Sequence, residues 1–199
     1  MVMWGGIALL ILVICYFVFS KSEAEIKGEE GEKIVGKYLK KLNQKNYEVF
    51  HDLQFSINGK ISQIDHLVIS NYGVFVIETK NYKGMIKGRE HDANWTQIIG
   101  KYKNPFYSPI RQNRGHIYAL KHVLRGFRLE EFESIIVFTN RGTLNVKSVT
   151  PVIYPKRLVK QIKKNREVII SDDLKQCLIR RIKEENLSKR KRIQLKKAS

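Results

Sequence analysis

Two apolar runs separated by a short breaker form the clearest pattern in this 199-residue chain. The runs cover residues 64–69 and 74–77, are rich in β-branched side chains, and flank an Asn-Tyr-Gly sequence at 71–73. This pattern predicts a tight hairpin of two largely buried strands. Buried strands rarely carry free charge, yet Asp65 interrupts the first run and Glu78 follows the second.

The register of the hairpin decides which polar side chains meet. With residues 71–72 as the turn, Asp65 lies opposite Glu78, and the Cβ atoms of such pairs are about 4.5–5.5 Å apart. In the same register Gln63 lies opposite Lys80. Glu78 and Lys80 are two apart on one strand and share a face. A slip of one residue, for instance through a bulge after the turn, would move Asp65 to the other face.

Two carboxylates at such a separation repel each other when both are ionised, so they are suited to share a proton or bind a divalent cation. Oxygen ligands favour Mg²⁺, with Mn²⁺ as an alternative. Lys80 beside them could hold a phosphate or lower the pKa of a metal-bound water. A cross-strand salt bridge between Lys80 and one of the carboxylates is the purely structural alternative.

Asp65 followed by Glu78-Thr79-Lys80 resembles the Asp…Glu-x-Lys signature of the restriction-endonuclease-like nuclease superfamily. A longer ordered set of motifs, covering about residues 28–140, resembles the nuclease-related (NERD) domain. The motifs are Gly28-Glu29-Glu30-Gly31-Glu32, Gln63-Ile64-Asp65-His66, Val76-Ile77-Glu78-Thr79-Lys80-Asn81-Tyr82, Trp95-Thr96-Gln97 and Asn104-Pro105. The resemblance implies an α/β fold with a restriction-endonuclease-like mixed β-sheet flanked by helices, and metal-dependent cleavage of phosphodiester bonds.

The resemblance also implies roles for individual residues. An acid on the first helix often reaches the metal in this superfamily, which favours Glu32 over Glu29. His116 shares a helix face with Gln112, but a lone helix histidine is usually structural, and His66 is expected to point away from the site. The candidate catalytic residues are Asp65, Glu78, Lys80, Glu32, Gln63, Gln97 and Gln112, and the candidate metal ligands are Asp65, Glu78 and Glu32.

Periodicity and turn residues predict the remaining elements. Two prolines predict a loop at 104–109, and a continuous apolar run predicts a core strand at 134–138. The other expected elements are a helix from Gly28 to about Leu42, strands at 47–50, 85–88 and 149–154, and helices at 110–124, at 155–164 and from Asp172.

Residues 2–19 carry no charge, and as a helix of about 27 Å they could cross a bilayer core of about 30 Å. A cleavable signal peptide is the alternative, although no Lys or Arg precedes the apolar run. Lys21 and further lysines follow it, so the positive-inside rule predicts a single-pass protein of the cell membrane with its soluble domain in the cytoplasm.

The net charge of +18 favours polyanionic partners. We expect nucleic acid, with DNA favoured over RNA, and a homodimer would supply two active sites for cutting a duplex. A catalytically inactive nucleic-acid-binding module and a scaffold on anionic membrane are alternatives. Cys15 and Cys177 do not suggest a disulfide. The predicted organisation is a transmembrane anchor at 1–20, a tether at 21–27, a NERD nuclease-like domain at 28–144, a C-terminal strand and helices at 145–188, and a basic tail at 189–199.

Overall fold

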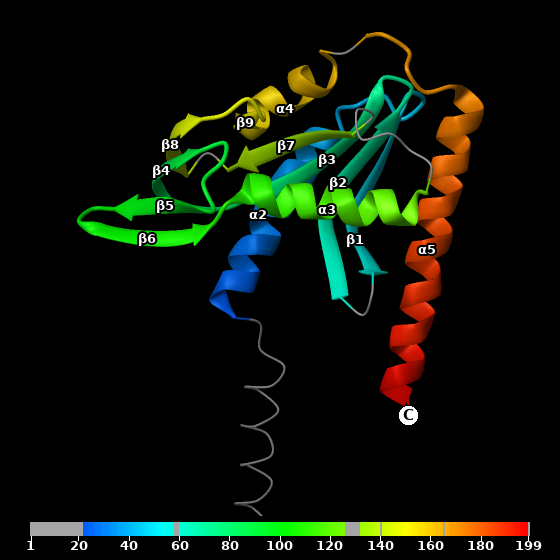
Figure 1. Ribbon diagram of the computed structural model, residues 1–199, viewed down its shortest axis with the longest axis horizontal. Coiled ribbons are helices and arrows are strands. Elements are labelled where there is room, and N and C mark those ends of the chain that lie inside the picture. Colours follow the sequence, from blue (N-terminus) through cyan, green and yellow to red (C-terminus); the bar gives the residue numbers. More distant parts are fainter. Residues whose placement is uncertain (1–21, 58–59, 126–131, 140, 165, 199) are drawn as a thin grey trace, which may run out of the picture.

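The structure of this chain, a computed structural model, describes residues 22–57, 60–125, 132–139, 141–164 and 166–198 (Figure 1). The predicted membrane anchor at residues 1–20 lies outside the described residues. Within the described part of the chain, no helix is both long and apolar enough to cross a membrane. The transmembrane helix therefore stays a prediction from the sequence.

The described residues form four helices and nine strands. In order they are α2 (Glu23–Leu39), β1 (Tyr47–Ile57), β2 (Lys60–Ser70), β3 (Gly73–Lys80), β4 (Gly84–Arg89), β5 (Asn94–Ile99), β6 (Tyr102–Tyr107), α3 (Pro109–Val123), β7 (Phe132–Phe138), β8 (Gly142–Lys147), β9 (Val152–Ile153), α4 (Pro155–Ile162) and α5 (Asp172–Ala198). The class is mixed α/β, as predicted. The backbone of the basic tail continues helix α5 to Ala198.

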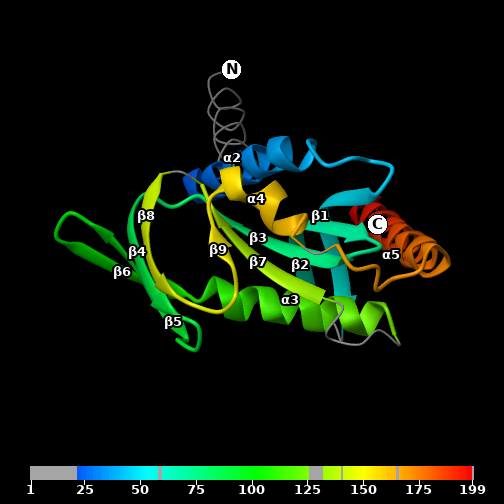
Figure 2. The ribbon, with the colours of Figure 1, turned by 90° about the horizontal axis from the view of Figure 1, so that it is seen from above.

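Two mixed sheets organise the domain. The first has the strand order β1-β2-β3-β7-β9, in which β1, β2 and β3 are antiparallel and β7 runs parallel to both β3 and β9. The second has the order β6-β5-β4-β8, with β4 parallel to β8. Helices α2 and α4 cover one face of the first sheet, and α3 and α5 pack on the other face (Figure 2).

Side-chain alternation along β3 divides its residues between these two faces. Val76 packs in the core beneath α3, whereas Phe75 and Ile77 pack in the core beneath α2. The same alternation continues past the apolar run. It directs Glu78 and Lys80 to the side of the sheet that α3 covers.

The predicted register of the central hairpin is confirmed. Ser70 pairs with Gly73 and His66 pairs with Ile77, so residues 71–72 form a two-residue turn. Gly73 has φ 142, a conformation that favours glycine. Continued by one position, this register sets the two carboxylates of the hairpin opposite each other. The one-residue slip does not occur.

Helix α2 begins earlier than expected. The sequence predicts a tether over 21–27 and a helix from Gly28, but the helix begins at Glu23 with Ser22 as its N-cap. Ser22 Oγ accepts a hydrogen bond from Glu25 N at 3.3 Å, and Glu25 Oε2 accepts one from Ser22 N at 2.8 Å. This capping box satisfies backbone amides that would otherwise lack partners. The predicted helix start at Gly28 is therefore wrong, and α2 includes the residues of the predicted tether from Glu23 onward.

A second difference concerns the segment with two prolines. The sequence predicts a loop over 104–109, but β6 pairs with β5 and includes Pro105 opposite Thr96. Strand β6 lies at the edge of its sheet, where an N–H on the open side is not needed, so proline is tolerated. Pro109 lies in the first turn of α3, where its missing N–H has no helical acceptor.

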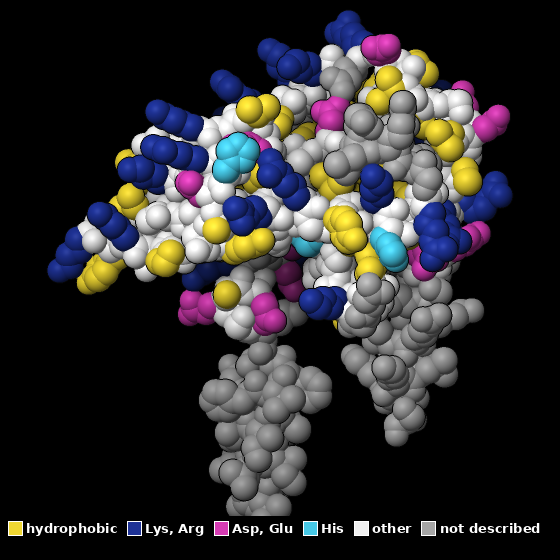
Figure 3. Space-filling view, in the orientation of Figure 1, with side chains coloured by type: hydrophobic (Ala, Val, Ile, Leu, Met, Phe, Trp, Pro, Cys, Tyr) yellow, Lys and Arg dark blue, Asp and Glu magenta, His cyan; other side chains and the backbone are white. Residues whose placement is uncertain are grey.

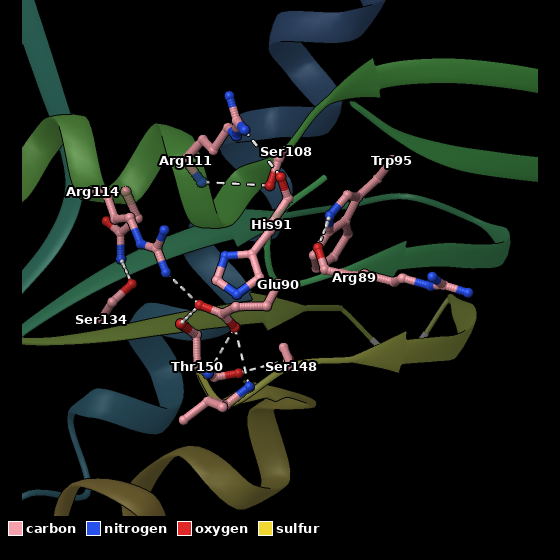
Figure 4. Close-up of polar contacts among 12 residues, drawn as sticks. Arg89, Glu90, His91, Trp95, Ser108, Arg111, Arg114, Ser134, Ser148 and Thr150 are labelled. Atoms are coloured by element: carbon pink, nitrogen blue, oxygen red, sulfur yellow. Dashed lines mark hydrogen bonds and ion pairs between the residues drawn. The ribbon is translucent and has the colours of Figure 1, made fainter. Parts of the chain in front are cut away.

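Glu90, immediately after β4, ties the second sheet to the rest of the domain (Figure 4). Its carboxylate accepts hydrogen bonds from the N–H groups of Val149 and Thr150 at 3.1 and 3.0 Å and from the Thr150 hydroxyl at 2.9 Å, and it pairs with Arg114 of α3. Burial raises the pKa of Glu90, but the Thr150 hydrogen bonds and Arg114 outweigh burial and hold the pKa below its usual range. The ionised carboxylate thus joins β4, α3 and the segment between β8 and β9.

A histidine pair joins β1 and β2, with His66 buried and His51 exposed. His51 and His66 are opposite each other in the ladder, their Nδ1 atoms are 2.8 Å apart, and their rings meet edge-on with centroids 4.9 Å apart. Burial and the neighbouring His51 lower the pKa of His66 to about 3. The folded protein therefore holds His66 neutral at a pH where a free histidine is charged.

This pair predicts an acid-sensitive contribution to stability. Below about pH 6.5 the unfolded chain binds a proton at His66 that the folded protein does not bind. The stabilisation is complete above about pH 6.5 and is lost as the pH falls toward 3. Between about pH 7.5 and about pH 5, we expect His66 to lower the free energy of unfolding by about 2 kcal/mol.

Urea unfolding at the two pH values, on the wild type and on His66→Gln, measures this contribution. Glutamine keeps a hydrogen-bonding side chain but does not titrate, so the variant should lose less stability on acidification. His122→Gln, at an exposed position on α3, is the matched control and should behave as the wild type. An equal loss in the wild type and in His66→Gln would contradict the assignment.

Candidate active site

A cavity of about 860 Å³ opens where β3 ends, between the first halves of α2 and α3. In Figure 3, Asp and Glu side chains gather around the start of α2, and Lys and Arg side chains cover the neighbouring left part of this face. All the catalytic candidates predicted from the sequence line this one cavity. They are Glu32, Gln63, Asp65, Glu78, Lys80, Gln97 and Gln112.

Glu78 lies at the centre of the polar contacts, and its side chain is only 1% exposed. Its Oε1 accepts a hydrogen bond from Lys80 Nζ at 2.6 Å, and its Oε2 lies 3.3 Å from His116 Nε2. Burial raises the pKa of Glu78, but His116 and Lys80 outweigh burial, so the pKa lies below its ordinary value. Glu78 is therefore an ionised carboxylate in a mostly apolar sheet.

Lys80 is the cation that offsets the cost of burying the Glu78 carboxylate. Besides Glu78, its Nζ donates to Gln112 Oε1 on α3 at 2.9 Å. Burial lowers the pKa of Lys80, but the Glu78 carboxylate more than compensates, so the pKa is raised. The lysine is charged, and Gln112 helps to hold it at the wall of the cavity.

Asp65 reaches the site from β2. Its Oδ2 accepts a hydrogen bond from the Thr79 N–H at 2.7 Å, which connects the two strands of the hairpin. Burial and the neighbouring Glu78 raise the pKa of Asp65 to about 8, although the Thr79 hydrogen bond acts in the opposite direction. The same cavity thus holds Glu78, which is ionised, and Asp65, which is mostly protonated at neutral pH.

Glu32 is brought to the cavity by a close approach of α2 to the end of β3. A Cβ atom on Gly31 would lie 2.8 Å from Asn81 Cβ and 3.3 Å from Thr79 Cγ2, so only glycine allows this helix to pack so closely. Asn81 also donates to Lys27 O at 2.6 Å. Burial raises the pKa of Glu32, and nearby acids, including Glu78, raise it further.

Two of the predicted glutamines have partners away from the charged pair. Gln63 Nε2 donates to Asp52 Oδ1 at 2.9 Å, and Gln97 Nε2 donates to Lys83 O at 2.9 Å. Both side chains line the cavity. Their amides lie at its wall, whereas Gln112 contacts the charged pair directly.

Ser62 and His116 extend the polar chain in a way that the sequence did not reveal. His116 shares a face of α3 with Gln112, as predicted, and lies against Glu78. Its Nδ1 is 2.9 Å from Ser62 Oγ, so a serine of β2 orients the histidine that faces the carboxylate. No local motif marks Ser62, because only the packing of α3 on β2 brings the two residues together.

The oxygen donors that line the cavity suit a divalent cation. Asp65, Glu78 and Glu32 are hard oxygen donors on one cavity, and the Glu78 charge helps to raise the pKa of both Asp65 and Glu32, which a cation would relieve. Glu78 Oε2 is buried and makes no well-aligned hydrogen bond with the described residues. Among all the residues that the structure describes, however, no three His, Cys, Asp or Glu side chains are already arranged as a metal-binding group.

Fold and cavity together define a class of protein. A mixed sheet with an acid on one strand and Glu-x-Lys at the end of the next is the arrangement expected of the restriction-endonuclease-like superfamily. Residues 27–139 match the model of a family in that superfamily, the nuclease-related domain, NERD. The chain therefore belongs to the NERD family.

One curated relative is similar over more than half of this chain. It is an uncharacterized protein of Bacillus anthracis, 42% identical over 119 residues, which is 59% of this chain and 56% of the relative. The chain thus spans little more than half the length of this relative. No solved structure matches the chain.

The buried pair predicts strong coupling between Glu78 and Lys80. Lys80→Met leaves the Glu78 charge buried without its closest partner, and such a change costs about 3 kcal/mol of unfolding free energy. Adding Glu78→Gln removes that charge, so the double variant should return to within about 1 kcal/mol of the wild type. Urea unfolding of the wild type, both single variants and the double variant measures the coupling. Additive effects of the two substitutions would contradict the pairing.

Proposed function

We propose that this protein is a metal-dependent nuclease that hydrolyses phosphodiester bonds in nucleic acid, with DNA as its main substrate. The observation that carries the proposal is the convergence of Asp65, Glu78 and Lys80 on one cavity. Membership in the NERD family supports it independently. Further cations on the lining of the cavity, Lys83 and Arg141 among them, suit a polyanionic substrate.

The residues of the cavity would have different roles in the proposed hydrolysis. Asp65, Glu78 and Glu32 would hold Mg²⁺ or Mn²⁺, which when bound activates water and neutralises charge on the scissile phosphate. The Lys80 ammonium, held by Gln112, would stabilise the negative charge that develops on the phosphate during attack. Enclosure of these groups strengthens their electrostatic effect on the reacting phosphate.

The cellular setting is part of the proposal. An uncharged helix over residues 2–19 would anchor the chain, and the lysines that follow it would keep the domain in the cytoplasm. A domain held there would meet chromosomal DNA and Mg²⁺. Two copies side by side would supply the two active sites that cutting both strands of a duplex requires.

The direct test is a cleavage assay of the full chain on linear, circular and single-stranded DNA and on RNA, with Mg²⁺, Mn²⁺ or EDTA. We expect metal-dependent cutting, strongest on DNA, that falls by at least about 100-fold in Glu78→Gln, because the variant loses a ligand and the charge that positions Lys80. Glu48→Gln, on β1 and paired with Lys183 rather than with the cavity, is the matched control and should cut as the wild type.

A binding module without catalysis is the second candidate function. It is favoured by the contact of Lys80 with Glu78, which already neutralises the carboxylate without a metal. If no substrate is cut while Glu78→Gln retains nucleic-acid binding that weakens steeply with salt, the nuclease proposal fails and the binding module takes its place.

Metal binding can be measured apart from catalysis. A cation that binds only the folded protein raises its thermal midpoint in proportion to RT ln(1 + [L]/Kd). We expect Mn²⁺ to raise the midpoint of the wild type and to have little effect on Asp65→Asn, which removes an ionisable oxygen donor. Asp173→Asn, an exposed change at the start of α5, should respond as the wild type. Equal shifts in all three proteins would contradict the assigned ligand.

A further inference from the structure

The hairpin of β5 and β6 projects from the body of the domain (Figure 1). Its strands pair from Asn94 with Tyr107 to Ile99 with Tyr102, so Gly100 and Lys101 form a two-residue turn. Gly100 has φ 58, which glycine adopts without strain. A short turn and a regular ladder give this hairpin a defined end.

One face of the hairpin is continuous with the wall of the candidate active site. Gln97 and Ile99 of β5 both line the cavity. Directly paired residues share a face of a sheet, so Asn104 and Tyr102 of β6 lie on the same side as these two residues. A strip of side chains therefore leads from the cavity to the turn and ends at Tyr102.

The end of this strip carries an exposed aromatic ring beside positive charge. Tyr102 is 64% exposed, and Lys101 Nζ lies 5.7 Å from the centroid of its ring. Lys83 lies at the other end of the strip, on the lining of the cavity. Figure 3 shows hydrophobic and basic side chains together at the tip of the projection.

We propose that the β5–β6 hairpin is a binding arm for an unpaired nucleic-acid strand, in which Tyr102 stacks on a base and Lys101 contacts the neighbouring phosphate. The arm would guide the strand along Ile99 and Gln97 into the cavity. The inference rests on the proposed function only in the class of substrate, because binding by the arm requires neither metal nor catalysis.

The chemistry of the strip favours an unpaired strand over a duplex. A tyrosine ring can stack only on a base whose face is free, and bases within a duplex already stack on one another. Every base has such a face, so this contact is tolerant of sequence. Duplex DNA would meet only the lysines, which bind phosphates without regard to strandedness.

Fluorescence anisotropy of the full chain in detergent and EDTA tests the arm. The probes are a labelled oligothymidylate of about 20 nucleotides and a duplex of the same length. We expect Tyr102→Ala and Tyr102→Leu to weaken binding of the oligothymidylate at least about fivefold, Tyr102→Phe to retain it, and binding of the duplex to change less than about twofold. Leucine preserves an apolar side chain on the strand, so it separates loss of stacking from loss of the hairpin.

Tyr107 supplies a matched control on the same hairpin. It is 55% exposed, but by strand alternation it lies on the face opposite to Tyr102. Tyr107→Ala should bind the oligothymidylate as the wild type. The proposed arm would be contradicted if both alanine variants weakened binding equally, or if Tyr102→Ala weakened duplex binding as much as oligothymidylate binding. It would also be contradicted if Tyr102→Ala had no effect, or if the wild type did not bind the oligothymidylate.

Cleavage, measured in parallel with Mg²⁺, separates this inference from the proposed function. If binding depends on Tyr102 but no substrate is cut, the binding arm is supported and the nuclease proposal fails. If the wild type cuts nucleic acid but Tyr102→Ala binds the oligothymidylate as the wild type does, the nuclease proposal stands and the binding arm is contradicted.

Discussion

The two-residue turn at residues 71–72 is the constraint on which the site depends. It sets β2 against β3 in the one register that places Asp65 beside the end of β3. The turn is itself anchored from the far end of the chain, since Asn71 donates to Ile170 O at 3.1 Å and Asp172 Oδ1 at 2.8 Å and its carbonyl accepts the Ile170 N–H. A shift of one residue would turn Asp65 away from the cavity. The start of α5 thus stabilises a site that it does not touch.

The second physical feature is the burial of charge at the end of β3. Removing charged groups from water is costly, and the protein offsets this cost by pairing Glu78 with Lys80 and by surrounding the pair with Gln112 and His116. A fold selected for stability alone would be served as well by apolar residues at these positions. The buried carboxylate and ammonium therefore fit the proposed role of this site in phosphodiester hydrolysis.

Local patterns predicted the parts of this structure that are determined locally. The Asn-Tyr-Gly breaker between two apolar runs predicted the hairpin and a register in which Asp65 and Glu78 meet, but only the structure excludes the slip of one residue. The role of Ser62 was not predictable, because it depends on the packing of α3 across β2. Pro105 was misread as a loop residue, since the sequence does not show that β6 lies at a sheet edge. The start of α2 could have been predicted from the capping-box spacing of Ser22 and Glu25.

The central claim is that Glu78 and Lys80 act on phosphodiesters and do not merely hold the fold together. The double variant Lys80→Met, Glu78→Gln tests it most directly, because it removes both charges and leaves none buried without a partner. Mg²⁺-dependent cleavage of DNA by this protein should fall at least about 100-fold while the fold and nucleic-acid binding remain. A stably folded double variant that cuts DNA at the wild-type rate would contradict the account.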